Sequence, residues 1–268
     1  MKQLVVNADD FGFTRDVNRG IIEAHVNGIL TATTLMANGS AFDDAVRLAH
    51  EHPSLDVGCH LVLVGGNSLS TRNPLPGSVA QLLQAIALRR INSYAELKPQ
   101  VEKILAAGLR PQHADTHKHT HLWPPVLDAV ARLSEEFRIP WIRRPFDFPL
   151  SGTGEVAWTK RAVSQSLRGL RRGFHRKLAK HGCRTTDYFA GFQITGSYRT
   201  KELAALMAAL PEGSTEFMTH PGFCDDELRA SQTRLKESRE EELRALTSPE
   251  VREAVERLGV TPTRYRDL

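Results

Sequence analysis

The chain alternates between short apolar, β-branched stretches and longer stretches with helical spacing, and this order limits the folds it can adopt. Such alternation predicts a parallel sheet whose strands are joined by crossover helices. There is no internal repeat and no low-complexity linker, so we expect residues 1–268 to form a single domain, a distorted β/α barrel with parallel strands. Strands are predicted at 4–6, 29–36, 55–64, 112–121, 141–142 and 215–219, and helices at 17–27, 41–50, 82–88, 94–107, 126–137, 201–210, 239–246 and 250–258.

Polar residues gather where the predicted strands end. Asp9 and Asp10 follow the first strand, His60 lies late in the third, and His220 directly follows the last. In β/α barrels the C-terminal ends of the strands form the mouth of the active site. We therefore expect these side chains to meet at one end of the barrel, together with a histidine run at 115–121.

That run reads Asp-Thr-His-Lys-His-Thr-His. In an extended strand its two-residue spacing places Asp115, His117, His119 and His121 on one face. Such a face packs poorly in an apolar core, whereas imidazole and carboxylate are the usual ligands of a catalytic divalent metal. The alternative is a solvated or hydrogen-bonded polar face. Spacing alone leaves open which of the three histidines is a ligand.

The paired carboxylates Asp9 and Asp10 suit two different tasks. Adjacent side chains diverge, so one carboxylate can bind a metal while the other faces a substrate water. One carboxylate, two imidazoles and an open position are typical of a catalytic hydrolase site, in which the metal lowers the pKa of bound water. The alternatives are ordinary: aspartates also cap helices and shape turns. His220 can protonate a leaving nitrogen or simply bond to the backbone.

Taken together, four motifs resemble the YdjC/ChbG family of carbohydrate deacetylases over nearly the whole chain. They are Asn7-Ala8-Asp9-Asp10-Phe11-Gly12, Gly58-Cys59-His60, the run at 115–121, and Thr219-His220-Pro221. The resemblance implies a distorted β/α barrel and metal-dependent removal of an acetyl group, as acetate, from an acetylated amino sugar. The implied substrate is an oligosaccharide or glycolipid that contains N-acetylglucosamine.

The resemblance also implies roles for individual residues. Asp9 would be the general base and His220 the general acid. Arg143 would hold the base in position, although the adjacent Arg144 leaves open which of the two arginines does so. One divalent metal ion, Mg²⁺ or Zn²⁺, would be held by Asp10, His60 and His117. The other members of the histidine run, Asp115, His119 and His121, would orient the ligands or contact the substrate.

A basic helical insert is predicted at about 157–186. Residues 160–186 hold nine Lys or Arg and no Asp or Glu, and an apolar stripe recurs at helical spacing through Val163, Leu167, Leu170, Phe174 and Leu178. The stripe either packs on the barrel with the charges in water or belongs to an interfacial helix that meets anionic lipid headgroups. A hopanoid-biosynthesis branch of the same family has a similar basic segment and implies a membrane glycolipid, but it often has Asn at the position of Asp115.

Composition excludes several classes of protein. The net charge of +4 arises from the basic insert, because the rest of the chain has more acidic than basic residues. General nucleic-acid binding is therefore not indicated. Three widely spaced cysteines and the lack of a membrane-spanning apolar run predict a cytoplasmic protein, with peripheral contact at the inner membrane face through the insert. An oligomer is compatible with the sequence. The rival functions are hydrolysis of another amide, ester or phosphoester, and non-catalytic binding of a metal or carbohydrate, for which Asp9 would be unnecessary.

Overall fold

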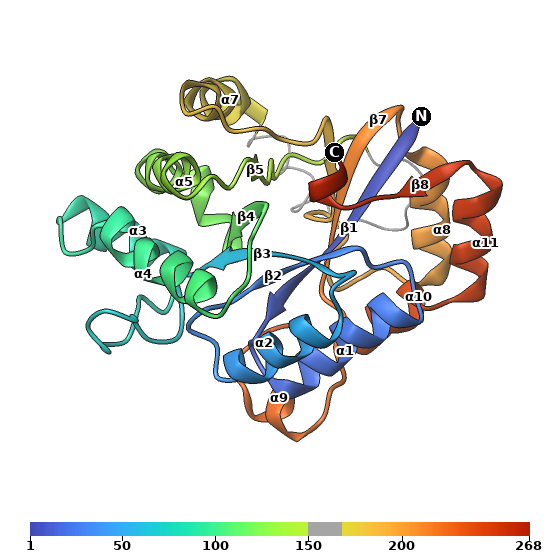
Figure 1. The fold of residues 1–268 in the computed structure, drawn as a ribbon, viewed down its shortest axis with the longest axis horizontal. Helices are drawn as coiled ribbons and strands as arrows, with labels where there is room; N and C mark the ends of the chain where they lie inside the picture. The colour runs from blue at the N-terminus through green and yellow to red at the C-terminus, as the bar shows by residue number, and fades with distance from the viewer. Residues whose placement is uncertain (150–167) are drawn as a thin grey trace.

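The computed structural model describes residues 1–149 and 168–268, and within them eight strands form one parallel sheet (Figure 1). The order along the sheet is β5-β4-β3-β2-β1-β7-β6, and β8 pairs with β1. Isolated parallel bridges at Trp141–Arg184 and Asp147–Phe189 link the β5 and β6 ends, so the sheet curls into the distorted barrel predicted from the sequence. The strands are β1 (Lys2–Phe11), β2 (Ala32–Leu35), β3 (Asp56–Leu61), β4 (His113–Thr116), β5 (Trp141–Ile142), β6 (Tyr188–Ala190), β7 (Gly213–Thr219) and β8 (Val260–Pro262).

Helices surround the curled sheet (Figure 1). Local signals set several of their ends: the Thr14 side chain accepts a hydrogen bond from Val17 N at the start of α1, and prolines occupy the first turn of α5. The helices are α1 (Arg15–Val26), α2 (Phe42–Glu51), α3 (Val79–Ala87), α4 (Ser93–Ala106), α5 (Pro124–Phe137), α7 (Arg171–Lys180), α8 (Thr200–Ala209), α9 (Asp226–Ala230), α10 (Glu237–Leu246) and α11 (Pro249–Arg257), with 3₁₀ turns η1 (His117–Leu122), η2 (Arg168–Leu170) and η3 (Tyr265–Asp267).

The central strand β1 separates an outer core from the barrel interior. Leu4, Val6 and Ala8 belong to the large apolar core shared with the helices, whereas Val5, on the opposite face, belongs to a small cluster with Tyr265. The polar residues of the motifs continue this inner face toward the end of the strand. Period-two alternation along β1 therefore supplies both a core and a polar interior.

An irregularity in β1 changes the direction of its last residues. Ala8 pairs with Thr33 and Phe11 with Leu35, so β1 carries one extra residue in this stretch, and Asp10 has a φ of 70°. Such bulges redirect side chains next to active sites. Asp9 and Asp10, which would face opposite sides of a regular strand, both reach the same site.

The expectation of a strand through the whole histidine run is wrong. β4 ends at Thr116, and residues His117–Leu122 form a 3₁₀ turn in which Lys118 and His119 have φ values of 56° and 51°. The Thr116 hydroxyl accounts for the turn, because it accepts a hydrogen bond from His121 N (3.0 Å) and lies 2.6 Å from His121 Nδ1. The side chains of the run consequently do not share one face.

The basic insert is described only in part, because Val163 and Leu167 lie outside the described residues. In α7, Phe174 and Leu178 are buried and the helix packs on α5, while Leu170 just before it is 44% exposed. The described part of the stripe thus packs on the barrel. In the portion of the chain that the structure covers, we find no helix with the length and hydrophobicity needed to cross a bilayer.

Gly58, in the second motif, lies in close contact with His113 in the barrel interior. A Cβ at this position would lie 2.5 Å from both the carbonyl oxygen and the ring of buried His113. Gly58→Ala should therefore destabilise the protein by about 1–3 kcal/mol, as overpacking does, measured by urea unfolding. Gly173→Ala is the matched control, since nothing lies within 4 Å of its added Cβ and a helical alanine is favoured over glycine by about 1 kcal/mol. Equal stabilities of the two variants would contradict this view of the interior.

Candidate metal centre and active site

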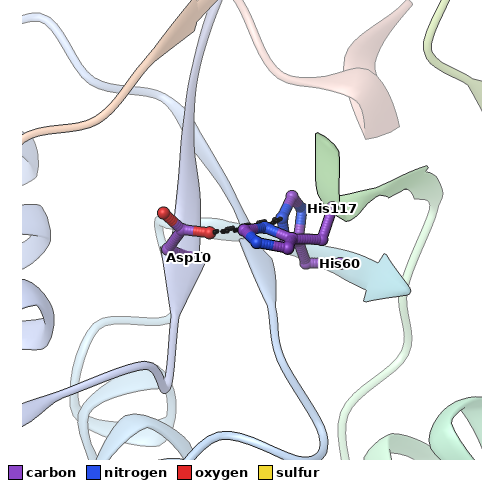
Figure 2. Close-up of side chains that lie close together, drawn as sticks. All are labelled: Asp10, His60 and His117. Carbon is purple, nitrogen blue, oxygen red and sulfur yellow. Dashed lines mark hydrogen bonds and ion pairs between the residues drawn. The ribbon is translucent and has the colours of Figure 1, made fainter. Parts of the chain in front are cut away.

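Three side chains from different parts of the barrel converge at the mouth (Figure 2). Asp10 Oδ1 lies 3.3 Å from both His60 Nε2 and His117 Nδ1, and the two nitrogens are 3.2 Å apart. Asp10 comes from the end of β1, His60 from β3, and His117 directly follows β4. Asp10 and His60 are buried, whereas the His117 side chain is 25% exposed, so the cluster borders solvent on one side.

The donor set fits a divalent metal ion. Asp10 Oδ1 is buried and, among the described residues, accepts no hydrogen bond of good geometry. The three ligand atoms lie within 4.8 Å of one another. One carboxylate and two imidazoles suit Zn²⁺ or another transition metal better than Mg²⁺, which prefers oxygen ligands.

Asp115 fixes the orientation of the His60 ring. Its Oδ1 lies 2.6 Å from His60 Nδ1, so that nitrogen donates a proton and Nε2 is left to face the cluster. Asp115 Oδ2 in turn accepts from Thr34 Oγ1 at 3.2 Å. Burial alone would lower the pKa of His60, but the carboxylates of Asp115, Asp10 and Asp9 outweigh it and raise the pKa to about 10.

Arg239 binds the other oxygen of Asp10. The buried guanidinium donates to Asp10 Oδ2 at 2.5 Å, which leaves only Oδ1 for the cluster. Burial opposes ionisation of Asp10, but Arg239, His117 and His60 outweigh it and hold its pKa well below the usual range. No local pattern predicts this contact, because Arg239 stands in the run Glu237-Ser238-Arg239-Glu240-Glu241, which is typical of a solvated helix.

Asp9 is held by a different arginine. Both of its oxygens accept from Arg143, at 2.6 and 2.7 Å, and Oδ1 also accepts from Asn7 Nδ2 at 3.1 Å. Arg143 overcomes the opposing effect of burial and lowers the pKa of Asp9 far below its usual value. The neighbouring Arg144 bonds instead to the Asp187 carbonyl, so Arg143 is the arginine that contacts Asp9.

A second group of carboxylates and imidazole, formed by Asp9, His60 and Asp115, also has metal-ligand spacing. The Arg143 guanidinium already lies between its two carboxylates, 2.7 Å from Asp9 Oδ2 and 2.6 Å from Asp115 Oδ2. A second cation there would be repelled by this fixed positive charge. The arrangement favours a single ion, bound on the Asp10 side.

His220 approaches Asp9 from the end of β7. Its Nε2 lies 3.8 Å from Asp9 Oδ2, and its backbone N donates to Glu242 Oε2 at 2.6 Å. Burial lowers the pKa of His220 despite the nearby carboxylates of Asp9 and Glu242, so the ring is neutral near pH 7. Glu242, which also accepts from the Tyr198 hydroxyl at 3.0 Å, was not recognised in the sequence.

The two remaining histidines of the run have different surroundings. His121 uses both ring nitrogens, one with Thr116 and the other 3.0 Å from the Arg143 carbonyl, and burial lowers its pKa to about 4. It therefore supports the backbone of Arg143. His119 lies among the rings of Phe189 and Phe192, and its Nδ1 has no hydrogen-bond partner within the described residues.

The chain folds as a parallel β/α barrel and brings a carboxylate and two imidazoles together beside a second carboxylate. This combination places it in the class of barrel hydrolases with a candidate metal centre. Residues 3–257 match the family described as YdjC-like protein, and the chain belongs to this family. It is 35% identical to the carbohydrate deacetylase of Brevibacillus brevis over 258 residues, 94% of each chain. It is 33% identical to that of Geobacillus stearothermophilus, over 98% of this chain and 97% of the relative.

A solved structure confirms the fold. A proposed cellobiose-phosphate cleavage protein from Enterococcus faecalis superposes with a TM-score of 0.75 at 24% identity, covering 99% of this chain and 98% of the other. Together, the fold, the family and the relatives identify the chain as an enzyme, a hydrolase of the deacetylase type.

Metal binding should release a proton from His60. Because its pKa is raised to about 10, the ring is protonated at neutral pH before the metal binds, and the ion must displace that proton. The apparent association constant should rise with pH, by up to about tenfold per unit between pH 6.5 and 8.5. Calorimetry of Zn²⁺ binding in buffers of different ionisation enthalpy measures the released protons. Asp115→Asn, which removes a carboxylate that raises this pKa, should weaken the dependence, and a pH-independent affinity in the unmodified protein would contradict it.

Proposed function

We propose that the chain is a metal-dependent N-deacetylase that hydrolyses the acetamide of an oligosaccharide or glycolipid containing N-acetylglucosamine and releases acetate. The observation that carries the proposal is that two adjacent carboxylates have different surroundings. Asp10 faces His60 and His117, whereas Asp9 faces His220. Relatives that carry the name carbohydrate deacetylase support the assignment of the substrate class.

The chain's own residues supply the proton transfers. A divalent ion held by Asp10, His60 and His117 would lower the pKa of a water and polarise the acetamide carbonyl. Asp9 stays ionised because of Arg143, so it orients the attacking water as a hydrogen-bond acceptor and takes its proton only briefly.

His220 completes the transfer. It is neutral near pH 7 and its Nε2 lies 3.8 Å from Asp9 Oδ2, so it can receive the water proton from Asp9. Protonated His220 then delivers that proton to the leaving nitrogen. The hydroxyl of the water ends on the acetyl carbon, the C–N bond breaks, and acetate and a free amine result.

The wall of the mouth offers contacts for a sugar. His119 is partly exposed beside Phe189 and Phe192, so the exposed part of its ring can contact a substrate, whereas its Nδ1 is buried and has no hydrogen-bond partner among the described residues. We assign His119 to substrate contact. Asp115 and His121 contact other residues of the site instead: Asp115 orients the His60 ring, and His121 bonds to the Arg143 carbonyl.

Acetate release tests the proposal directly. N-acetylglucosamine oligomers and an N-acetylglucosaminyl lipid should yield acetate, and chelation of the metal should abolish it. Asp9→Asn should lower kcat by about 10²–10⁴-fold, the usual contribution of a general base, while the metal content measured by mass spectrometry persists. His117→Ala should lose both metal and activity.

Each variant has an outcome that would contradict the proposal. Undiminished turnover in Asp9→Asn would remove Asp9 as the base, and full metal retention in His117→Ala would remove His117 as a ligand. Release of an O-acetyl group or phosphate without any release from N-acetyl sugars would replace the proposed reaction class.

The exposed face of α7 supports a contact with anionic membranes, and hence a glycolipid substrate. Phe174 and Leu178 pack inward, which directs Arg171, Arg172 and Arg176 into solvent. α7 contains no acidic residue that would neutralise these charges. Basic residues near an anionic surface contribute about 1 kcal/mol each.

Vesicle binding tests this contact. The double variant Arg171→Gln/Arg172→Gln should bind phosphatidylglycerol vesicles about 30-fold more weakly in a flotation assay, from the loss of about 2 kcal/mol. Arg252→Gln/Arg257→Gln, on the exposed face of α11, is the matched control and should not change binding. Equal binding to neutral and anionic vesicles, or none to either, would refute the membrane contact.

A further inference from the structure

Arg239, in α10, is a buried arginine whose guanidinium lies against Asp10. Its side chain is 1% exposed, and one terminal nitrogen donates to Asp10 Oδ2 at 2.5 Å. Figure 2 shows that the two oxygens of Asp10 point in different directions: Oδ1 faces the imidazoles of His60 and His117, and the other oxygen is turned away from them. Arg239 therefore holds the oxygen that lies outside the proposed metal cluster.

Backbone contacts fix the position of Arg239. Its Nε donates to the Leu235 carbonyl at 3.2 Å, and its carbonyl accepts from Gly222 N at 3.3 Å. Gly222 packs directly on the arginine, because a Cβ at this position would lie 3.2 Å from Arg239 Cδ. Gly222 also lies so close to Gly20 of α1 that a Cβ on Gly20 would be 2.4 Å from Gly222 Cα. These contacts leave the side chain little room to move away from Asp10.

A carboxylate can bind a metal ion through one oxygen or through both. A charge-assisted hydrogen bond to one oxygen favours binding through the other alone, because binding through both would weaken that hydrogen bond. The choice matters in a catalytic site, which needs an open position beside its three protein ligands for water or substrate. A second oxygen from Asp10 would take up part of the space that the reaction needs.

The charge of Arg239 does not favour metal binding by itself. A guanidinium next to the cluster repels a divalent ion, so it lowers the electrostatic attraction between that ion and Asp10. A contact that only served affinity would not place a positive charge there. The benefit of Arg239 is the orientation of the Asp10 carboxylate, which is the usual effect of a group that hydrogen-bonds a metal ligand.

We propose that Arg239 is a positioning residue for Asp10: it holds Oδ2, so that Asp10 binds the metal ion through Oδ1 alone. The inference rests on the role of Asp10 as a metal ligand in the proposed function. It gives α10 a part in the metal site, through a residue 229 positions from Asp10 in the sequence. Arg239 acts on the ion only through Asp10.

A crystal structure of the Zn²⁺-loaded, unmodified protein tests the inference without any variant. We expect Zn²⁺ on His60, His117 and Asp10 Oδ1, with Oδ2 still bonded to Arg239. Zn²⁺ bound through both Asp10 oxygens, or not bound by Asp10, would overturn the inference.

Arg239→Met removes the donor and keeps an unbranched side chain. The released Asp10 Oδ2 should then join the ligands, and the visible absorption of the Co²⁺-loaded protein should weaken, as it does when the coordination number of Co²⁺ rises. The metal content should persist because a repelling charge is lost, whereas kcat should fall by about 10–100-fold. Arg244→Met is the matched control and should change neither, since Arg244 lies on the surface of the same helix and bonds Glu240 and Glu241.

A purely structural role of Arg239 predicts a different result. Arg239→Met would then lose stability in urea unfolding, while its folded fraction kept the Co²⁺ spectrum of the unmodified protein, and this outcome would overturn the inference. Arg239→Lys, which keeps a charge and a donor, should restore most of the spectrum and of kcat. If the unmodified protein binds Co²⁺ but releases no acetate, the proposed function fails, whereas the spectra still decide the role of Arg239.

Discussion

The buried guanidinium of Arg143 is the contact on which the rest of the site depends. It is 2% exposed and touches three carboxylates, those of Asp9, Asp115 and Glu216, each at 2.6 Å. Removing one partner of a buried ion pair costs about 3–5 kcal/mol, because the remaining charge is left without compensation. Loss of Arg143 would leave three buried carboxylates without a countercharge. The polar interior of the barrel is therefore possible only around this arginine.

Two arginines give two adjacent aspartates different chemistry. Asp9 has both oxygens occupied by Arg143, so it is a poor metal ligand but a well-oriented acceptor. Asp10 has one oxygen occupied by Arg239 and the other directed at His60 and His117. The bulge in β1 allows this, since a regular strand would send one of the two side chains to the outer core. Backbone geometry and charge pairing together separate the roles.

The fold and part of the site follow from local patterns, and the rest depends on distant partners. Alternating segments predicted the parallel sheet, and polar residues at the strand ends predicted a site at the mouth without showing which histidine of the run belongs to it. The resemblance to the family implied Asp10, His60 and His117 as the ligands, and the structure brings these three side chains together. The strand expected through the histidine run was wrong because the Thr116 hydroxyl bonds to His121 and closes a turn. Buried Arg239 and Glu242 stand in a charged helical segment whose local pattern predicts solvent, and only contacts with Asp10 and His220 explain their burial. Such pairings join residues as far apart as 229 positions, a separation that no periodicity encodes.

The site combines fixed and adjustable parts. Asp9, Asp10 and His60 come from β1 and β3, and each is held by buried partners, which pre-organises them without further loss of side-chain freedom. His117 is different: it begins the turn that contains the left-handed residues Lys118 and His119, and no buried group holds its second nitrogen among the described residues. Left-handed residues other than glycine cost roughly 1–2 kcal/mol each and persist only where their surroundings enforce them. An ion bound to His117 would add such a constraint, so metal binding and the conformation of this turn should stabilise one another. The same turn carries His119, which we propose to contact substrate, so this contact would lie only two residues from His117, the proposed ligand with the fewest buried partners.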